Sequence, residues 1–324
     1  MKPPIDPAAV FAAGRLIALP TETVYGLAAP IDRPDLIARV FKLKGRPATN
    51  PLIVHVGSLD QARSCVREWP DLAQRLADHF WPGPLTLVLP KAVTVSDVIT
   101  AGQPTVALRM PDHPVALRLL QTSPAPLVAP SANLFTRLSP TRADDVRAVF
   151  DAADVEVVDG GPCRVGIEST IIGLDPDERT VSWLRPGLIS QDAIRAVLPT
   201  DWHLQSGAAS SVRESGQQAP GQMREHYRPD KPLTVVVSRR SPAEIFALPD
   251  DTEPGCTILA LPDDPTIAAR QLYQSLRQAE RAGPDQIGLV LPPEYLDDPA
   301  WEGVVNRLRK AASVWRDEAR SGGG

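Results

Sequence analysis

Short apolar runs alternate with amphipathic segments over the first 200 residues of the chain. Apolar runs of this kind predict buried strands, and apolar residues that recur every three or four positions predict helices. The predicted strands are 15–19, 51–56, 85–89, 105–109, 126–129, 154–158, 169–174 and 180–184. The predicted helices are 33–44, 58–67, 70–79, 113–122, 141–150 and 190–197. Strands outnumber helices and do not strictly alternate with them, so we expect a mixed sheet.

The periodicity ends near residue 200, and residues 200–230 are rich in Ser, Gly, Gln and Pro, a composition typical of a linker. Apolar runs then alternate with predicted helices, in the order 233–237, 242–247, 256–261, 264–282, 286–291 and 299–318. This pattern predicts a small α/β unit with a three-stranded parallel sheet. We therefore expect domains at 1–199 and 231–320, joined by the linker.

Composition narrows the class of protein. The 324 residues suffice for two domains, and 43% hydrophobic with 23% charged residues is usual for a globular chain. A net charge of −5 argues against a protein that coats nucleic acid. A basic groove in one part of the surface is still compatible with this charge. Cys65, Cys163 and Cys256 form no CxxC pair, which argues against a disulfide scaffold or zinc ribbon and indicates a reducing cytosol. We expect a cytoplasmic protein without a signal peptide or membrane segment.

Polar residues follow the predicted strands. Thr21-Glu22-Thr23 comes where the first strand stops at Pro20, and Lys44-Gly45-Arg46 follows the next helix. Ligands of open α/β sheets lie at the carboxyl ends of strands, so these groups suit an anionic small molecule. A polar turn with a solvated helix end is the alternative. Arg109 ends an apolar strand and needs an anionic partner if it is buried, whereas His55 alone is more typical of a core histidine.

Several common catalytic motifs are absent. The sequence contains no GxxxxGK[ST], no GxGxxG after a strand, no HExxH and no GxSxG. A nucleotide would therefore be bound without a P-loop or a Rossmann fingerprint.

Eight motifs occur in a fixed order: PTETVYGL, KxR before NPLIVH, WPGPLT, VALRMP, APSAN, SPT, GIESTI and LRPG. Together they resemble the YrdC-like domain of the threonylcarbamoyl-AMP synthase family, over about residues 8–198. PG…HYxP in the linker and NRLRKAAS near the C-terminus are similar to the longer form of that family. The resemblance implies an α/β (α+β) fold: a twisted mixed sheet with helices around an open cavity, plus a small three-layer parallel α/β domain.

The resemblance also implies a reaction. Such a nucleotidyltransferase makes L-threonylcarbamoyladenylate and pyrophosphate from L-threonine, bicarbonate and ATP, for N6-threonylcarbamoyladenosine in tRNA. The product would pass to a tRNA threonylcarbamoyl transferase complex, and a weak contact with tRNA is a further expectation. The chemistry needs positioning and cations more than covalent help, so no acid or base is assigned. We expect Mg²⁺ to arrive with ATP and to be held mainly by phosphates and water.

Motif correspondence implies two groups of binding residues. The L-threonine site is expected to contain Thr23, His55, Arg109, Ala129 and Ser169, with Arg109 bidentate to the carboxylate. The ATP site is expected to contain Lys44, Arg46, Asn50, Thr105, Ser131, Ser139, Arg185 and Arg224. At Met223 and Arg224 the chain departs from the family pattern, which has a basic residue and a nucleotide-facing tyrosine.

Three interpretations stay open beyond the pocket. The segment before His226 and Tyr227, which match the family, is expected to be a lid, with a tether held by aromatic packing as the alternative. The basic residues Arg307, Arg309 and Lys310 are expected on a solvated helix face, with a docking surface as the alternative. For the whole chain, the alternatives are an RNA-binding module without turnover and a related enzyme that adenylates carbamoyl phosphate for metallocentre assembly.

Overall fold

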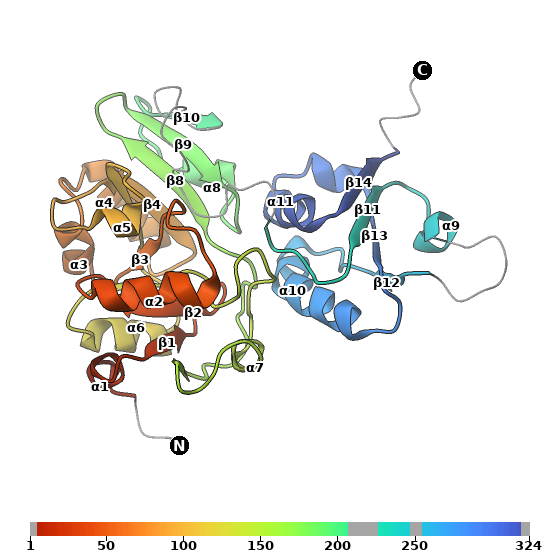
Figure 1. The fold of residues 1–324 in the computed structure, drawn as a ribbon. Coiled ribbons are helices and arrows are strands. Elements are labelled where there is room, and N and C mark those ends of the chain that lie inside the picture. The colour runs from red at the N-terminus through yellow and green to blue at the C-terminus, as the bar shows by residue number, and fades with distance from the viewer. Residues whose placement is uncertain (1–4, 207–225, 247–254, 319–324) are drawn as a thin grey trace. The chain divides into compact units, whose positions relative to one another are not determined.

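The computed structural model describes residues 5–206, 226–246 and 255–318, and the chain forms two compact units (Figure 1). The first unit contains residues 5–135 and 140–206. The second contains the described residues from His226 onward and also residues 136–139. The sequence gives no sign of this short excursion of the chain into the second unit.

The first unit is built on a ten-stranded sheet with the order β10-β9-β8-β4-β5-β3-β6-β2-β1-β7. Its parallel and antiparallel pairs confirm the mixed sheet expected from the sequence. The strands are β1 Leu16–Leu19, β2 Gly26–Pro30, β3 Ile53–His55, β4 Leu85–Pro90, β5 Thr105–Arg109, β6 Leu127–Val128, β7 Val155–Val157, β8 Thr170–Asp175, β9 Thr180–Arg185 and β10 His203–Ser206. Sequence analysis missed β2 and β10.

Helices join these strands, and polar or proline caps define where most of them begin. They are α1 Pro7–Ala12, α2 Pro34–Lys44, α3 Leu59–Ser64, α4 Asp71–Phe80, α5 Asp97–Thr100, α6 Pro114–Thr122, α7 Ala143–Arg147 and α8 Gln191–Arg195. Helix α2 starts on a proline and ends at Gly45, whose φ of +61° turns the chain sharply before Arg46. The hydroxyl of Ser58 caps α3 by accepting from the Gln61 amide at 3.2 Å.

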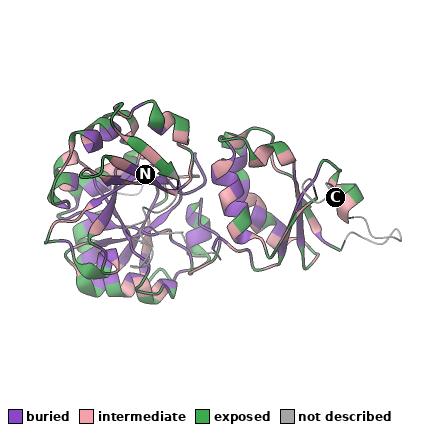
Figure 2. Cartoon of the chain, turned by 90° about the horizontal axis from the view of Figure 1, so that it is seen from above, coloured by how far each residue is buried: buried purple, intermediate pink, exposed green. Residues whose placement is uncertain are grey.

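The two faces of the central strands differ in character. Because successive side chains point to opposite faces, Val106 and Leu108 of β5 lie on one face and Ala107 and Arg109 on the other. The first face belongs to the large hydrophobic core, and Figure 2 colours the buried residues of the chain purple. The second face carries only a small apolar cluster, formed by Ile53, Val88, Ala107 and Ile171. Polar side chains occupy the rest of it.

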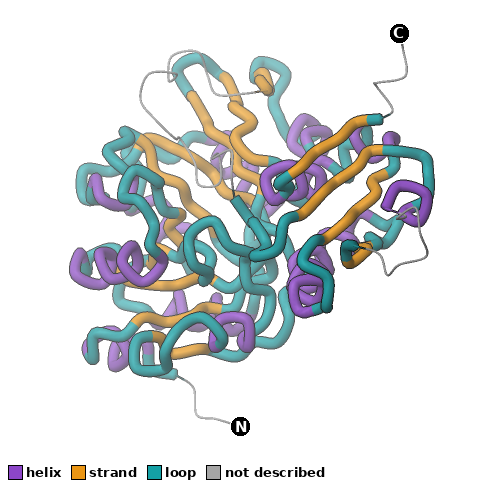
Figure 3. The backbone as a smooth tube through the Cα atoms, turned by 45° about the vertical axis from the view of Figure 1, so that its right-hand side comes forward, coloured by secondary structure: helices purple, strands orange, loops and turns teal. Residues whose placement is uncertain are grey.

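The second unit contains a four-stranded parallel sheet with the order β12-β13-β11-β14, whose strands run side by side (Figure 3). Its elements are β11 Leu233–Val237, α9 Pro242–Phe246, β12 Thr257–Leu259, α10 Pro265–Arg281, β13 Ile287–Leu291, the 3₁₀ helix η2 Pro293–Leu296, α11 Glu302–Ala311 and β14 Val314–Asp317. Two predictions are wrong here: the sheet has four strands where three were predicted, and residues 314–317, predicted to be helical, form its fourth strand, β14. The chain leaves the helix at Ala312, and β14 pairs with the otherwise open edge of β11.

We expect the large core to carry much of the stability of the first unit. Replacing the fully buried Leu108 by Ala should lower the free energy of unfolding by about 2–5 kcal/mol, because it removes apolar contacts and leaves a cavity. Val93 is 100% exposed, so Val93→Ala is the control and should change stability by less than about 0.5 kcal/mol. Urea denaturation followed by circular dichroism measures both. Equal effects of the two substitutions would contradict this assignment of the core.

Candidate active site

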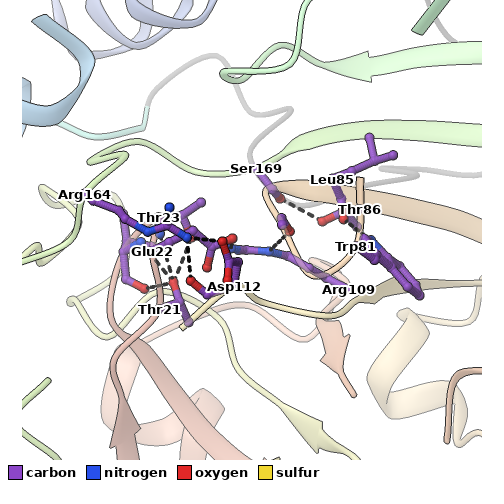
Figure 4. A network of polar contacts seen from close by, with 12 residues as sticks. Thr21, Glu22, Thr23, Trp81, Leu85, Thr86, Arg109, Asp112, Arg164 and Ser169 are labelled. Atoms are coloured by element: carbon purple, nitrogen blue, oxygen red, sulfur yellow. Dashed lines mark hydrogen bonds and ion pairs between the residues drawn. The ribbon is translucent and has the colours of Figure 1, made fainter. Parts of the chain in front are cut away.

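Two buried threonines form a hydrogen-bonded chain just after β1 (Figure 4). The Thr21 hydroxyl donates its proton to the Val24 carbonyl oxygen at 2.6 Å. The Thr23 hydroxyl lies 2.8 Å from Thr21 Oγ1 and must therefore be the donor of that bond. Thr23 Oγ1 in turn accepts from Nη1 of Arg109 at 2.7 Å. The hydroxyls predicted from the sequence are thus tied directly to the guanidinium at the end of β5.

Arg109 is buried, with 4% of its side chain exposed, and it contacts two segments of the chain. Besides Thr23, its Nε donates to the Gly83 carbonyl oxygen at 3.3 Å. Its Nη2 lies 2.6 Å from Oε1 of Glu22, whose side chain is 1% exposed. Glu22 is therefore the anionic partner that a buried arginine requires. Sequence analysis noted this carboxylate but did not include it among the site residues.

His55 occupies the position beside Arg109, because β3 and β5 pair in parallel with these two residues in register. Its ring is 3% exposed, and Nδ1 lies 3.3 Å from the Ile53 carbonyl oxygen. Burial, and secondarily the charge of Arg109, lower the pKa of His55 to about 3. Since a carbonyl oxygen only accepts, the neutral ring carries its proton on Nδ1 and leaves Nε2 as an acceptor.

Ser169 links a second arginine to the same sheet face. Its hydroxyl lies 2.7 Å from Thr86 Oγ1 and accepts from Nη2 of Arg185 at 3.1 Å. Arg185 Nε also donates to the Ser169 carbonyl oxygen at 3.1 Å. A residue expected to bind threonine and one expected to bind ATP are therefore direct neighbours. Thr86 was missed by sequence analysis; a hydroxyl inside the apolar run 85–89 is the signal that marks it.

Lys44 and Arg46 form a second cluster at the end of α2. The Lys44 side chain is 2% exposed, and Nζ donates to the carbonyl oxygens of Ser131 and Asn133. Burial, and secondarily the charge of Arg46, hold the pKa of Lys44 well below its usual value. Arg46 donates to Oδ1 of Asn50 at 2.6 Å. Four residues expected at the ATP site thus lie together, although Lys44 serves here to fix the turn at 131–133.

The remaining predicted site residues have different environments. Thr105 begins β5 and lies on the same strand face as Arg109. The Ala129 amide donates to the Ile53 carbonyl oxygen at 3.1 Å, so its amide is already used within the sheet. Ser139 belongs to the second unit, where its carbonyl oxygen accepts from Nη1 of Arg277 at 3.0 Å. Arg224 and most of the expected lid lie outside the described residues.

The His226-Tyr227 pair lies in the interior of the second unit. The two rings meet edge to face with centroids 4.1 Å apart, and the Tyr227 ring is 5.8 Å from that of Tyr273. The Arg307 guanidinium lies 5.5 Å from the centre of the Tyr227 ring, and Arg307 is 0% exposed. The expectation of a solvated Arg307 is therefore wrong, because stacking on an aromatic ring lets a guanidinium be buried.

In the described parts of the chain, no three His, Cys, Asp or Glu residues converge as metal ligands, and no helix is long and apolar enough to cross a membrane. A cavity of about 690 Å³ lies among α1, α6 and β7, lined by residues that include Val10, Leu119 and Val157. None of the predicted site residues lines that cavity.

Comparisons with known proteins give two family matches, one after the other along the chain. The family model described as "Telomere recombination" matches residues 9–187, and the one described as "Threonylcarbamoyl-AMP synthase, C-terminal domain" matches residues 189–313. The threonylcarbamoyl-AMP synthase of Pyrococcus abyssi is 38% identical over 315 residues, covering 92% of this chain and 91% of the relative. That of Bacillus subtilis is 35% identical over 326 residues, covering 94% and 91%.

A solved structure of this family resembles the chain over nearly its whole length. The crystal structure of Pyrococcus abyssi Sua5 complexed with L-threonine superposes with a TM-score of 0.80 and 35% identity, covering 95% of each chain. Fold and polar sheet face thus define a two-domain protein with a YrdC-like first domain. The chain belongs to the threonylcarbamoyl-AMP synthase family.

The low pKa of His55 has a measurable consequence. The ring should stay neutral between pH 5 and 8, with its proton on Nδ1, and ¹⁵N NMR should show no titration of it in that range. The unfolded chain binds a proton at His55 near pH 6.5, so this residue lowers stability as the pH falls below that value. His55→Gln should flatten that part of the pH–stability curve. A His55 titration near pH 6.5 in the folded protein, as in its urea-unfolded control, would contradict the burial argument.

Proposed function

We propose that this chain is an L-threonylcarbamoyladenylate synthase that converts L-threonine, bicarbonate and ATP into threonylcarbamoyl-AMP and pyrophosphate, for N6-threonylcarbamoyladenosine formation in tRNA. The buried polar face that carries the Thr23–Arg109 contact and the Ser169–Arg185 contact is the observation on which the proposal rests. The full-length family likeness, and a relative's structure with L-threonine, support it.

The reaction is a nucleotidyl transfer in two stages. The threonine amine and bicarbonate first form a carbamate and release water. A carbamate oxygen then attacks the α-phosphorus of ATP, and pyrophosphate leaves in line with the new bond. Such chemistry needs the reactants held in line, with positive charge over the phosphates, which arginine and lysine side chains supply.

The threonine site is proposed around Arg109. Its guanidinium would bind the amino-acid carboxylate through two parallel hydrogen bonds. The Thr23 hydroxyl accepts a hydrogen bond from this guanidinium, and the Ser169 hydroxyl accepts one from the guanidinium of Arg185. Nε2 of His55, left as an acceptor, would accept a hydrogen bond from the side-chain hydroxyl of threonine. A polar group of this kind, unpaired when valine binds, would disfavour valine relative to threonine.

The nucleotide site is proposed around Arg46, Asn50 and Arg185, with Lys44 holding the turn that presents Ser131. Thr105, Ser139 and Arg224 stay predictions from the motifs. Mg²⁺ would be carried on the ATP phosphates, where it neutralises charge as pyrophosphate departs. Hard oxygen ligands from phosphate and water suit this ion.

We place the reaction in the cytosol, a setting with which the three free cysteines are compatible. The mixed anhydride product is prone to hydrolysis, so direct delivery to a tRNA threonylcarbamoyl transferase complex is the proposed next step. Any contact of this chain with tRNA would be weak at a net charge of −5.

Pyrophosphate release from ATP tests the proposed function. We expect release with threonine and bicarbonate together, and loss of release when either is omitted, because the carbamate is the nucleophile. Pyrophosphate release that continues unchanged without threonine and without bicarbonate would contradict the proposal. A requirement for carbamoyl phosphate in place of threonine and bicarbonate would indicate the related enzyme that adenylates that compound.

A matched pair of substitutions tests the division of the site. Arg109→Lys and Arg46→Lys both keep the positive charge but lose the planar two-point contact. The first should weaken threonine binding by about 10–100-fold, as expected for the loss of a charge-assisted hydrogen bond, and affect ATP much less. The second should do the reverse. Calorimetry measures both ligands, and equal losses in the two variants would refute the division.

A further inference from the structure

Glu22 is a buried carboxylate with incomplete bonding. Its side chain is 1% exposed, and neither carboxylate oxygen accepts a hydrogen bond from the described residues. Its charge contact there is Nη2 of Arg109, 2.6 Å from Oε1, in an orientation that forms no aligned hydrogen bond. An ionised carboxylate has about four acceptor positions, so Glu22 has acceptor positions directly beside Arg109 that the described residues leave unused.

Two backbone hydrogen bonds hold the main chain at Glu22. The Val165 amide donates to the Glu22 carbonyl oxygen at 2.8 Å, and the Gly166 amide donates to that of Thr23 at 3.1 Å. The main chain at Glu22 is thus held between the turn after β1 and the loop at 163–166, while no hydrogen bond from the described residues holds its carboxylate in place. The nearby carboxylate of Asp112 already accepts from Arg164 (Figure 4).

A substrate that carries a carboxylate but no positive charge would bind unfavourably beside the Arg109–Glu22 pair. If it bound Arg109, two anions would share one guanidinium, and two carboxylates in one site repel each other. An α-amino acid brings an ammonium as well, and its nitrogen lies about 2.5 Å from the carboxylate carbon by standard bond lengths. Arg109 Nη2 and Glu22 Oε1 lie 2.6 Å apart, so the two ends of a zwitterion can each reach one member of the pair once the two side chains separate.

We propose that Glu22 binds the ammonium group of the amino-acid substrate, and that the zwitterion inserts into the Arg109–Glu22 ion pair. The substrate carboxylate binds Arg109, and the substrate ammonium donates to the carboxylate of Glu22. Each of the four charges then has an opposite partner, and the net charge of the site does not change. The inference rests on the proposed function, because it concerns the same threonine site.

Glu22 therefore selects α-amino acids against acids that lack the amine. (R)-3-Hydroxybutanoate keeps the carboxylate, the hydroxyl and its configuration, but has hydrogen in place of the ammonium. In the wild-type protein it would leave Glu22 beside a second anion without a cation between them. The wild-type protein should bind it at least about 100-fold more weakly than L-threonine, given the strength of charged hydrogen bonds.

Calorimetry of both ligands with the full chain and its Glu22→Gln variant tests the inference. The substitution preserves shape but removes the negative charge, so threonine affinity should fall about 10–100-fold. Affinity for (R)-3-hydroxybutanoate should stay the same or rise, because Arg109 loses its internal competitor. An equal loss for both ligands would show that Glu22 only orients Arg109 and would overturn the proposal.

Glu156→Gln is the matched control. Glu156 pairs with Arg15 at 2.9 Å on β7 and is 34% exposed, so this variant should bind both ligands as the wild type does. If Glu22→Gln does not fold, calorimetry of the wild-type protein alone still tests the inference. Equal affinity of the wild type for the two ligands would refute it. Failure of the wild type to bind threonine at all would instead refute the proposed function.

Discussion

The buried contact between Arg109 and Glu22 is the interaction on which the arrangement of the site depends. A guanidinium with 4% exposure is stable only where anions and carbonyl oxygens surround it, and these come from separate segments. The turn after β1 supplies Glu22 and Thr23, and the loop before β4 supplies Gly83. Loss of either charge would leave the other unpaired in the interior. The pair therefore fixes the ends of β1 and β5 relative to each other.

The alternation of side chains along the strands makes such a site compatible with a stable sheet. Leu108 and Val106 belong to the large core, while Arg109 points to the opposite face of β5. The same separation holds on β3, where Val54 is in the core and His55 faces the site. A shift in register by one residue would bury the charged groups in the core, so the apolar face of each strand enforces the position of the polar one.

The sequence predicts most of this arrangement for a physical reason. Strands made of Leu, Ile and Val runs are visible in it, and a charged residue at the end of such a run, like Arg109, marks a functional position. Strand β2 is not visible, because its Gly-Leu-Ala-Ala-Pro sequence is typical of a turn and gains its conformation only from neighbouring strands. Contacts between distant positions are equally invisible: Thr23 and Arg109 are 86 positions apart, and the Tyr227 ring that buries Arg307 lies in another segment.

The excursion at residues 136–139 bears on how this protein is made. Arg277 donates to the carbonyl oxygens of Leu138 and Ser139, which precede it by 139 and 138 positions. On the ribosome these carbonyls must therefore wait for their partner through the synthesis of nearly 140 further residues, about 7–28 s at usual translation rates. The first unit emerges early, yet residues 136–139, which interrupt it in the sequence and belong to the second unit, cannot acquire these contacts until most of the chain has been translated.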